Sequence, residues 1–285
     1  MSRVIVAALE AAGAAARSAR VLVRPVSSLA ELTTLDRMLA GIWQADDSGR
    51  LLTTELLRAL AKSGNYVAGA FDDGALIGAA VAFFAAPGER ELHSHIAGVS
   101  AGAAGRNVGF ALKQHQRAWA LQRGINTISW TFDPLVARNA YFNLAKLGAL
   151  PIAYLPNFYG PMHDRINGDD DSDRLLVRWD LAAPAVVSAS AGKARRCVRP
   201  PTAAMALRRS AAGGPVPGST RGQTVVVAVP EDIEALRRSA PGAAKDWRAA
   251  VRDTLGALLA DGLRFAGFDR DGWYVLTRGT EAFGR

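Results

Sequence analysis

The first third of the chain alternates between the periodicities of helices and strands. Residues 3–19 repeat apolar positions every three to four residues, as in an amphipathic helix, and the β-branched run VLVRPV that follows predicts a first strand. Two further helices are predicted in the segments LAELTTLDRMLAGIW and TTELLRALAKSG. The strands NYVAGAF and ALIGAAVAFFA then flank Asp72, Asp73 and Gly74, which predicts a tight hairpin.

Residues 93–148 form the central pattern of the sequence. The strand ELHSHIAGVS leads into a glycine-rich turn and then a long helix, on which Lys113 and Arg117 fall opposite the apolar stripe. The buried strand INTISWTF follows, and the helix RNAYFNLAKL ends at Gly148. Together with the later strands PIAYL and LLVRWDL, this order predicts an α/β (α+β) fold, a mixed sheet with helices on its faces.

The C-terminal third has a different composition. Residues 181–222 are rich in Ala, Pro, Gly, Ser and Arg, which predicts a linker. Residues 223–285 read as a strand, helices and a hairpin, a small α+β unit that is marginal alone and is expected to dock on the first domain. We therefore expect a domain over 1–180, a basic linker and a small C-terminal unit.

Composition restricts the class of protein. The 285 residues are 49% hydrophobic, enough for one large or two modest cores. The single cysteine, Cys197, allows no intrachain disulfide and fits a reducing cytoplasm. No apolar run reaches the roughly 20 residues of a membrane span, and the N-terminal alanine-rich stretch contains a glutamate, so we expect a helix there and not a signal peptide.

The net charge of +8 is local. Residues 181–230 contain no Asp or Glu. The same segment contains Lys193, Arg195, Arg196, Arg199, Arg208, Arg209 and Arg221. A solvated basic linker and an RNA-binding segment both fit this pattern.

The glycine-rich turn is a candidate phosphate site. A strand that leads through a turn into a helix directs free backbone N–H groups and the positive end of the helix dipole at one spot. Gly102, Gly105 and Gly109 allow close approach of a ligand to the backbone, although such glycines also make ordinary turns.

These segments resemble the GNAT superfamily of N-acyltransferases, whose pyrophosphate-binding loop has the pattern [QR]-x-x-G-x-[GA]. The matching positions are Ala104, Gly105, Arg106, Asn107, Val108 and Gly109. Ala104 and Asn107 depart from the pattern, but Asn tolerates a left-handed backbone. The strings WTFDPLVARNAYFNLAKLGA, NFYG, DRINGDDDSDRL and VRW resemble a poorly characterised branch of similar length. The resemblance covers about residues 20–180 and, more faintly, 223–280.

The resemblance implies a mainly antiparallel GNAT-like sheet flanked by helices, and acyl-CoA, typically acetyl-CoA, as co-substrate. It also implies that the strand bearing Val99 splays from its neighbour. Backbone amides near residues 97–99 would then bind the pantetheine arm and the thioester oxygen. Asn139 and Asn143, four residues apart, could bond the amide groups of pantetheine from one helix face, or be surface or capping residues.

Glu91, His93 and His95 alternate along the predicted strand and are expected on one face. A histidine near its ordinary pKa can accept a proton from an amine at neutral pH, so the three form a candidate base cluster. Structural histidines are the alternative. No third ligand stands at a zinc-site spacing, so no metal is expected.

A tyrosine acts as general acid in many GNAT proteins, and the resemblance places Leu144 at that position. Tyr141 and Tyr159 are the possible substitutes, with packing as the alternative role of Tyr141. For an amino-acid-like acceptor, Arg138, Arg165 and Arg174 are candidates to bind a carboxylate, and Asp164 and Asp173 to bind an amine. The consecutive aspartates 169–171 are expected in a solvated loop.

Three functions follow as hypotheses. The first is an N-acyltransferase that moves an acyl group from acyl-CoA to the primary amine of a small molecule. The second keeps the fold but takes the acyl group from aminoacyl-tRNA bound by the basic stretch 181–221. The third is a binding module whose catalysis has lapsed.

Overall fold

The computed structural model describes residues 2–43, 52–86, 88–162, 170–194 and 196–279. The chain forms two compact units, the first made of residues 1–130 and 180–182 and the second of residues 131–179 and 183–285. Strand β5 begins in the first unit and ends in the second.

The first unit contains the helices and strands expected from the sequence. They are α1 (Arg3–Ala19), β1 (Leu22–Pro25), α2 (Leu29–Trp43), α3 (Thr54–Lys62), β2 (Tyr66–Asp72), β3 (Ala75–Phe84), β4 (Glu91–Val99), the 3₁₀ turn η1 (Ala101–Ala103), α4 (Val108–Gln122) and β5 (Thr127–Phe132). The predicted hairpin is confirmed: Asp72 pairs with Ala75, and Asp73 and Gly74 both have positive φ, at 45° and 82°.

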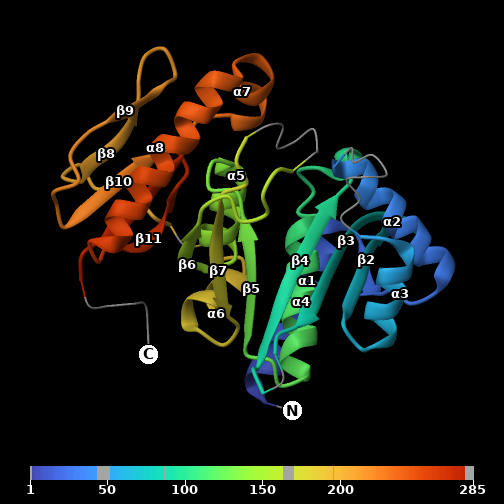
Figure 1. Ribbon diagram of the computed structural model, residues 1–285. Coiled ribbons are helices and arrows are strands. Elements are labelled where there is room, and N and C mark those ends of the chain that lie inside the picture. Colours follow the sequence, from blue (N-terminus) through green and yellow to red (C-terminus); the bar gives the residue numbers. More distant parts are fainter. Residues whose placement is uncertain (1, 44–51, 87, 163–169, 195, 280–285) are drawn as a thin grey trace. The chain divides into compact units, whose positions relative to one another are not determined.

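Helices cover both faces of the sheet in this unit (Figure 1). On one face, leucines of α2 and α3 pack on apolar residues of β2, β3 and β4, among them Val67, Val81 and Ile96. On the other face α4 lies so close to β3 that a Cβ at Gly78 would stand 3.1 Å from Val108 and 3.2 Å from Leu112. Helix α1 packs on α4 through a buried stripe of alanines, because small side chains allow two helices to approach closely.

The described residues of the second unit form further elements after the end of β5, of which β7 ends at Asp180, in the first unit. They are α5 (Ala137–Ala140), the π-helical segment η2 (Tyr141–Lys146), β6 (Leu150–Leu155), β7 (Arg174–Asp180), α6 (Pro184–Ser190), β8 (Ala204–Arg209), β9 (Pro215–Pro217), β10 (Thr224–Ala228), α7 (Ile233–Ser239), α8 (Pro241–Ala260), β11 (Arg264–Asp269) and β12 (Trp273–Thr277). The expected C-terminal hairpin is β11 and β12, which pair from Arg264 with Thr277 to Asp269 with Trp273.

The strands belong to two mixed sheets. The larger has the order β1-β2-β3-β4-β5-β7-β6, and its antiparallel pairs include β1–β2, β2–β3, β3–β4 and β6–β7, whereas β4 and β5 are parallel. The smaller has the order β11-β12-β10-β8-β9. The predicted fold class, a mainly antiparallel mixed sheet with helices and a further α+β part, is confirmed.

Residues 181–222 differ from the expected linker, because they contain α6, β8 and β9. Strand β8 is a member of the smaller sheet and pairs in parallel with β10, and Ala206 and Leu207 are buried. Strand β9 lies at the edge, where its two prolines cost no ladder hydrogen bond to a second neighbour. Short strands rich in alanine and proline lack the β-branched alternation that predicts a strand. They form here because strands from distant segments supply their hydrogen bonds.

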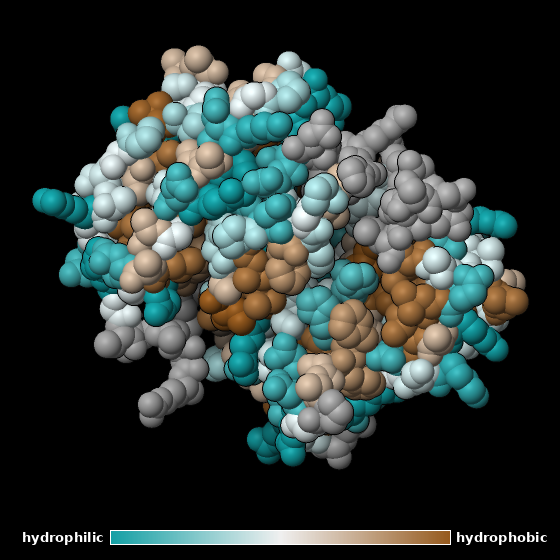
Figure 2. Space-filling model, viewed as in Figure 1, coloured by the Kyte–Doolittle hydropathy of each residue, from teal (hydrophilic) through white to brown (hydrophobic). Residues whose placement is uncertain are grey.

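Apolar surface patches are separated by polar side chains on the face seen in Figure 2. The exposed large hydrophobic residues include Phe83 and Phe84 on β3 and Phe158 and Tyr159 after β6. Among the described residues, no helix combines the length and the apolar character that a membrane crossing needs.

Candidate active site

Strands β4 and β5 pair over only three residues. Glu91, Leu92 and His93 face Thr127, Ile128 and Ser129, but β4 continues to Val99. On its other side β4 stays paired with β3 as far as Val99. Among the described residues, β4 pairs with β5 no further than His93, so its edge from Ser94 to Val99 can offer backbone groups to a ligand.

A bulge lies where the two strands part. Val81 pairs with Ile96 and Ala82 with Ser94, so His95 is the additional residue on β4. A bulge of this kind bends the strand and turns neighbouring side chains to one face. His93 and His95 lie on one face with Phe83, as the alternation of a strand already provides.

The turn after β4 has the backbone of a phosphate cradle. Gly105 has φ 78° and Asn107 lies in the left-handed region at φ 61° and ψ 20°, immediately before α4. The N–H of Ala111 donates to Asn107 O at 3.1 Å, so the N–H groups of residues 108–110 precede the first helical donor. These donors and the positive end of a 15-residue helix suit an anion.

Gly109 and Val99 meet at this end of the helix. A Cβ at Gly109 would lie 3.8 Å from Val99 Cγ2, an ordinary contact, and nothing else lies within 4 Å of it. Gly105 is different, because any side chain there would be strained by its positive φ. Ala104 is exposed, and Val108 is buried against Gly78.

The side chain of Arg106 forms hydrogen bonds outside the turn. Its Nη1 donates to Asp72 Oδ2 at 2.7 Å, and its Nη2 donates to the carbonyl of Ala19 at 3.3 Å, at the end of α1. The guanidinium thus joins the hairpin to α1.

The structure brings the two strand histidines together. The rings of His93 and His95 lie 6.3 Å apart, and both contact Phe83, at 5.1 and 5.8 Å between centroids. His93 Nδ1 also lies 3.5 Å from Ser129 Oγ. Burial lowers the pKa of both histidines, and His95 and Lys113 lower that of His93 further, whereas Glu91 raises it. Both rings are therefore neutral at neutral pH and able to accept a proton.

Lys113 is a feature that the sequence interpretation missed, because it was assigned to the polar side of α4. Its side chain is 4% exposed. Nζ donates to Ser94 Oγ at 2.8 Å and to Gln116 Oε1 at 3.2 Å, and it lies 3.8 Å from the centroid of the Trp130 ring. Burial lowers the pKa of Lys113 to about 7.

Arg117, assigned to the same polar side, is also buried. Its Nε and Nη2 both donate to the carbonyl of Leu181, at 2.9 and 2.7 Å. The sheet and α1 cover α4 on two faces, so polar side chains of this helix reach acceptors inside the unit.

The candidate acids lie in the second unit. Tyr141 begins the π-helical segment η2, and its hydroxyl accepts from Arg270 Nε at 3.1 Å. Tyr159 is 43% exposed, and its hydroxyl lies 2.9 Å from Thr131 Oγ1. Leu144, where the resemblance would place a tyrosine, is buried.

Asn139 and Asn143 differ from the expected shared face. Asn139 is exposed on α5, whereas Asn143 is buried within η2. The expectation assumed an α-helix, but the segment turns as a π-helix from Tyr141, with Leu147 N donating to Phe142 O. The wider turn rotates residues four apart away from each other.

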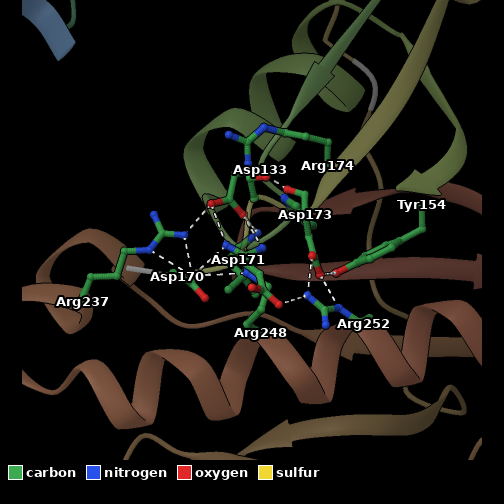
Figure 3. Close-up of polar contacts among 12 residues, drawn as sticks. Asp133, Tyr154, Asp170, Asp171, Asp173, Arg174, Arg237, Arg248 and Arg252 are labelled. Atoms are coloured by element: carbon green, nitrogen blue, oxygen red, sulfur yellow. Dashed lines mark hydrogen bonds and ion pairs between the residues drawn. The ribbon is translucent and has the colours of Figure 1, made fainter. Parts of the chain in front are cut away.

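A buried network of charges surrounds Asp133 and Asp170 (Figure 3). Arg248 donates to Asp133 at 2.9 and 3.0 Å and to Asp170 at 2.9 Å, and Arg237 binds both carboxylates. Burial alone would raise the pKa of Asp133, but the nearby guanidinium groups outweigh it and hold the pKa well below its ordinary range. Asp170 is 7% exposed, so the expectation of a solvated loop is wrong at this position.

Two of the proposed acceptor-binding residues belong to the same network. Asp173 accepts from Tyr154 Oη at 2.6 Å, from Asn157 N at 2.8 Å and from Arg252. Arg174 is buried and donates to the carbonyl of Asp173. Arg138 forms a two-point pair with Glu234 but stays 68% exposed. Asp164, with Arg165, lies outside the described residues.

Among the described residues, no three His, Cys, Asp or Glu side chains are grouped as a metal site would need.

Comparison with known proteins identifies one region. Residues 32–148 match the acetyltransferase (GNAT) family. No curated protein matches the sequence.

Several solved structures align with a little over half of the chain. An N-acetyltransferase from Staphylococcus aureus Mu50 is 15% identical and covers 56% of this chain and 98% of its own, with a TM-score of 0.48. A ribosomal-protein-alanine N-acetyltransferase from Brucella melitensis is 17% identical and covers 55% of this chain and 98% of its own, with a TM-score of 0.47. A putative acetyltransferase from Salmonella typhimurium, solved with acetyl-CoA, is 16% identical and covers 58% of this chain and 98% of its own, with a TM-score of 0.46.

Proposed function

We propose, from the match of residues 32–148 to the acetyltransferase (GNAT) family, that the protein is an N-acyltransferase that uses acyl-CoA to acylate the primary amine of a small molecule. Acetyl-CoA is the co-substrate of GNAT acetyltransferases. The acceptor proposed here is amino-acid-like, and the setting is the reducing cytoplasm that fits the single Cys197.

The observation that carries the proposal is the parting of β4 from β5 next to the α4 cradle. The unpaired edge of β4 runs from Ser94 to Val99, and the free N–H groups of residues 108–110 follow after one turn. A ligand with a pyrophosphate and a long amide-containing arm fits this arrangement, because the phosphate meets the helix end and the arm meets free strand backbone. Residues 97–99 are the proposed contacts of the arm.

The chemistry proposed is direct attack in a ternary complex. The amine nitrogen bonds to the thioester carbon, the carbon–sulfur bond breaks, and the amine loses one proton while the departing thiolate gains one. His93 and His95 are the proposed bases, since their lowered pKa values keep them neutral. Glu91 is the proposed modulator of His93. Free backbone N–H groups of β4 are the proposed donors to the oxyanion.

Tyr141 and Tyr159 stay the proposed acids for the thiolate, and both hydroxyls have the polar partners described above. Among the acceptor-binding candidates, Arg138 fits best because its guanidinium remains exposed. Asp173 fits less well, since its oxygens already accept from Tyr154, Asn157 and Arg252.

A thiol-release assay tests the proposal. Purified protein is mixed with acetyl-CoA, or with a longer or carboxylated acyl-CoA, and with a panel of amino acids and polyamines. We expect free CoA to appear with at least one amine well above the rate without amine. Amine-independent hydrolysis alone, or no release with any donor, would contradict the proposal.

Transfer from aminoacyl-tRNA stays the alternative donor. Lys193, Arg196, Arg208 and Arg221 are exposed, as a phosphate-binding surface needs. Arg209 does not add to such a surface, because its guanidinium donates to three backbone carbonyls: those of Val229, Asp271 and Gly272. A lapsed binding module is the remaining alternative, and it would bind CoA without releasing thiol.

A further inference from the structure

A buried cation stands where β4 and β5 separate. The last paired residues are His93 and Ser129, and the next residue on each strand contacts the Lys113 ammonium: Ser94 Oγ at 2.8 Å and the Trp130 ring at 3.8 Å. All these groups belong to the first unit. Lys113 thus lies at the fork, on the α4 side of the sheet.

This cation has no counter-ion among the described residues. Its interactions are with a hydroxyl, an amide oxygen and an aromatic face, and burial is the cause of its pKa shift. A buried charge without an opposite charge costs several kcal/mol, on the order of a few pKa units. Such a site gains stability when an anion binds beside it.

A second unmet donor lies next to the ammonium. Gln116 is fully buried, its Oε1 accepts from Lys113, and its Nε2 has no hydrogen-bond partner among the described residues. A buried N–H without an acceptor is unfavourable by about 1–3 kcal/mol. An ammonium and an amide N–H side by side match the two oxygens of a carboxylate.

The fork is the far end of the proposed donor site. From Val99, beside the start of α4, to Ser94 the unpaired edge of β4 spans roughly 16 Å at about 3.3 Å per residue. A CoA thioester carries its acyl group at the far end of its arm from the pyrophosphate. With the pyrophosphate at the α4 cradle, the acyl group reaches the fork, with the histidines on one face of the sheet and Lys113 on the other.

We propose that Lys113, with Gln116 and Ser94, binds a carboxylate at the end of the donor's acyl group, and that the donor is a CoA thioester of a dicarboxylic acid. This inference rests on the proposed function. The reaction is the same as with acetyl-CoA. One carbon–nitrogen bond forms, one carbon–sulfur bond breaks, and the terminal carboxylate takes no part in the chemistry. Binding of that carboxylate stabilises the charged form of Lys113.

The test compares succinyl-CoA with acetyl-CoA, at a fixed concentration of the same amine. The wild type is expected to show kcat/KM at least about tenfold higher for succinyl-CoA, since the carboxylate accepts hydrogen bonds from the buried Lys113 ammonium and the Gln116 amide. Lys113→Met keeps the length of the side chain and removes the charge. It is expected to lose at least about tenfold with succinyl-CoA and to stay within about threefold with acetyl-CoA. Calorimetry of each thioester without amine is expected to show the same preference in Kd.

Two further variants provide matched evidence. Gln116→Leu should weaken the succinyl preference, whereas Gln114→Leu should keep it, because Gln114 is an equally buried amide of α4 whose side chain forms no hydrogen bond with Lys113 among the described residues. If Lys113→Met does not fold, two measurements still test the inference. They are the preference of the wild type for succinyl-CoA and the comparison of that preference between Gln116→Leu and Gln114→Leu.

Equal use of the two thioesters by the wild type would overturn this inference and leave the proposed function standing. An equal loss with both thioesters in Lys113→Met would also overturn it, and assign the lysine to the fold. In a second series, with the donor saturating and the amine varied, a rise only in the KM of the amine would overturn the inference and assign the site to the acceptor. Failure of both thioesters with every amine would overturn the proposed function itself.

Discussion

His93 and His95 are the residues on which the chemistry proposed here depends most directly. Replacing the better placed one by alanine should lower kcat by about 10²–10⁴ and leave the Kd of the acyl-CoA nearly unchanged, because a base acts on the amine and not on the donor. Steady-state kinetics of His93→Ala and His95→Ala, with calorimetry of donor binding, measure both effects. Unchanged kcat in both variants would assign the histidines to structure.

The pH dependence of kcat adds a second measurement at the same residues. Burial places the folded-state pKa of His93 and His95 below the ordinary value of 6.5, so the basic form persists to lower pH than for an exposed histidine. We expect kcat to fall only when the pH drops below 6.5. A fall of kcat that begins above pH 6.5 on acidification would contradict the proposal that these histidines are the base.

At the level of single residues, the sequence indicated which side chains could take part in a reaction better than it indicated which side chains are buried. The alternation of His93 and His95 correctly indicated a shared face, since both rings contact Phe83, although the bulge at His95 was not predictable. Lys113 was assigned to a polar face, because a helical wheel cannot show that α1 covers α4 as well as the sheet does. Asp170 was assigned to solvent, since its arginine partners lie 67 and 78 positions away in the chain.

The turn between β4 and α4 is tested at the level of the element. Gly109→Glu should abolish acyl-CoA binding, because a carboxylate would occupy the end of α4 where phosphate is proposed to bind. Gly109→Ala is the matched control, since its Cβ meets only Val99 at 3.8 Å. Calorimetry with CoA should find no binding for the first and near-normal Kd for the second. Wild-type affinity in a folded Gly109→Glu would remove the turn from the donor site.

The network of Asp133 connects the end of β5 with α7 and α8 and predicts a stability effect. Asp133→Ala should lower the free energy of unfolding by about 3–5 kcal/mol, because it leaves Arg237 and Arg248 buried with one carboxylate fewer. Glu234→Ala removes the partner of the exposed Arg138 and should cost at most about 1 kcal/mol. Urea unfolding of the two variants compares them, and similar losses would show that burial does not strengthen this network.

The same network should weaken in acid. The pKa values of Asp133 and Asp173 lie below the ordinary 3.8 in the folded chain, so the unfolded chain binds more protons there. Their stabilisation is complete above that value and is lost as the pH falls through and below it. Urea midpoints between pH 3 and pH 6 should fall toward the acid end less steeply in Asp133→Ala.

Element boundaries were predictable wherever local chemistry sets them. Asp73 and Gly74 fix a hairpin through positive φ angles, and Gly148, at φ 73°, ends the helix as expected. The π-helical turns of η2 and the parallel pairing of β8 with β10 were not predictable, because they depend on packing and hydrogen bonds between distant segments. For that reason the expected shared face of Asn139 and Asn143 and the expected linker both differ from the structure.

The basic surface of residues 193–221 concerns the whole molecule, since it decides between the two donors. Changing Lys193, Arg196, Arg208 and Arg221 together to Gln should leave acyl-CoA turnover within about twofold, because exposed charges contribute little to a separate site. Arg209 is left intact for its backbone hydrogen bonds. A large loss of activity, with a tRNA gel shift that weakens steeply with salt in the wild type and disappears in the variant, would favour the tRNA donor.

The central claim is that this chain forms an amide bond by acyl transfer from CoA to an amine. Mass spectrometry of a reaction with acyl-CoA and the best amine of the panel measures it directly, by quantifying acylated amine and free CoA together. The account predicts equal amounts of the two, and neither product with Gly109→Glu. Free CoA without acylated amine, or acylated amine only when charged tRNA replaces acyl-CoA, would contradict it.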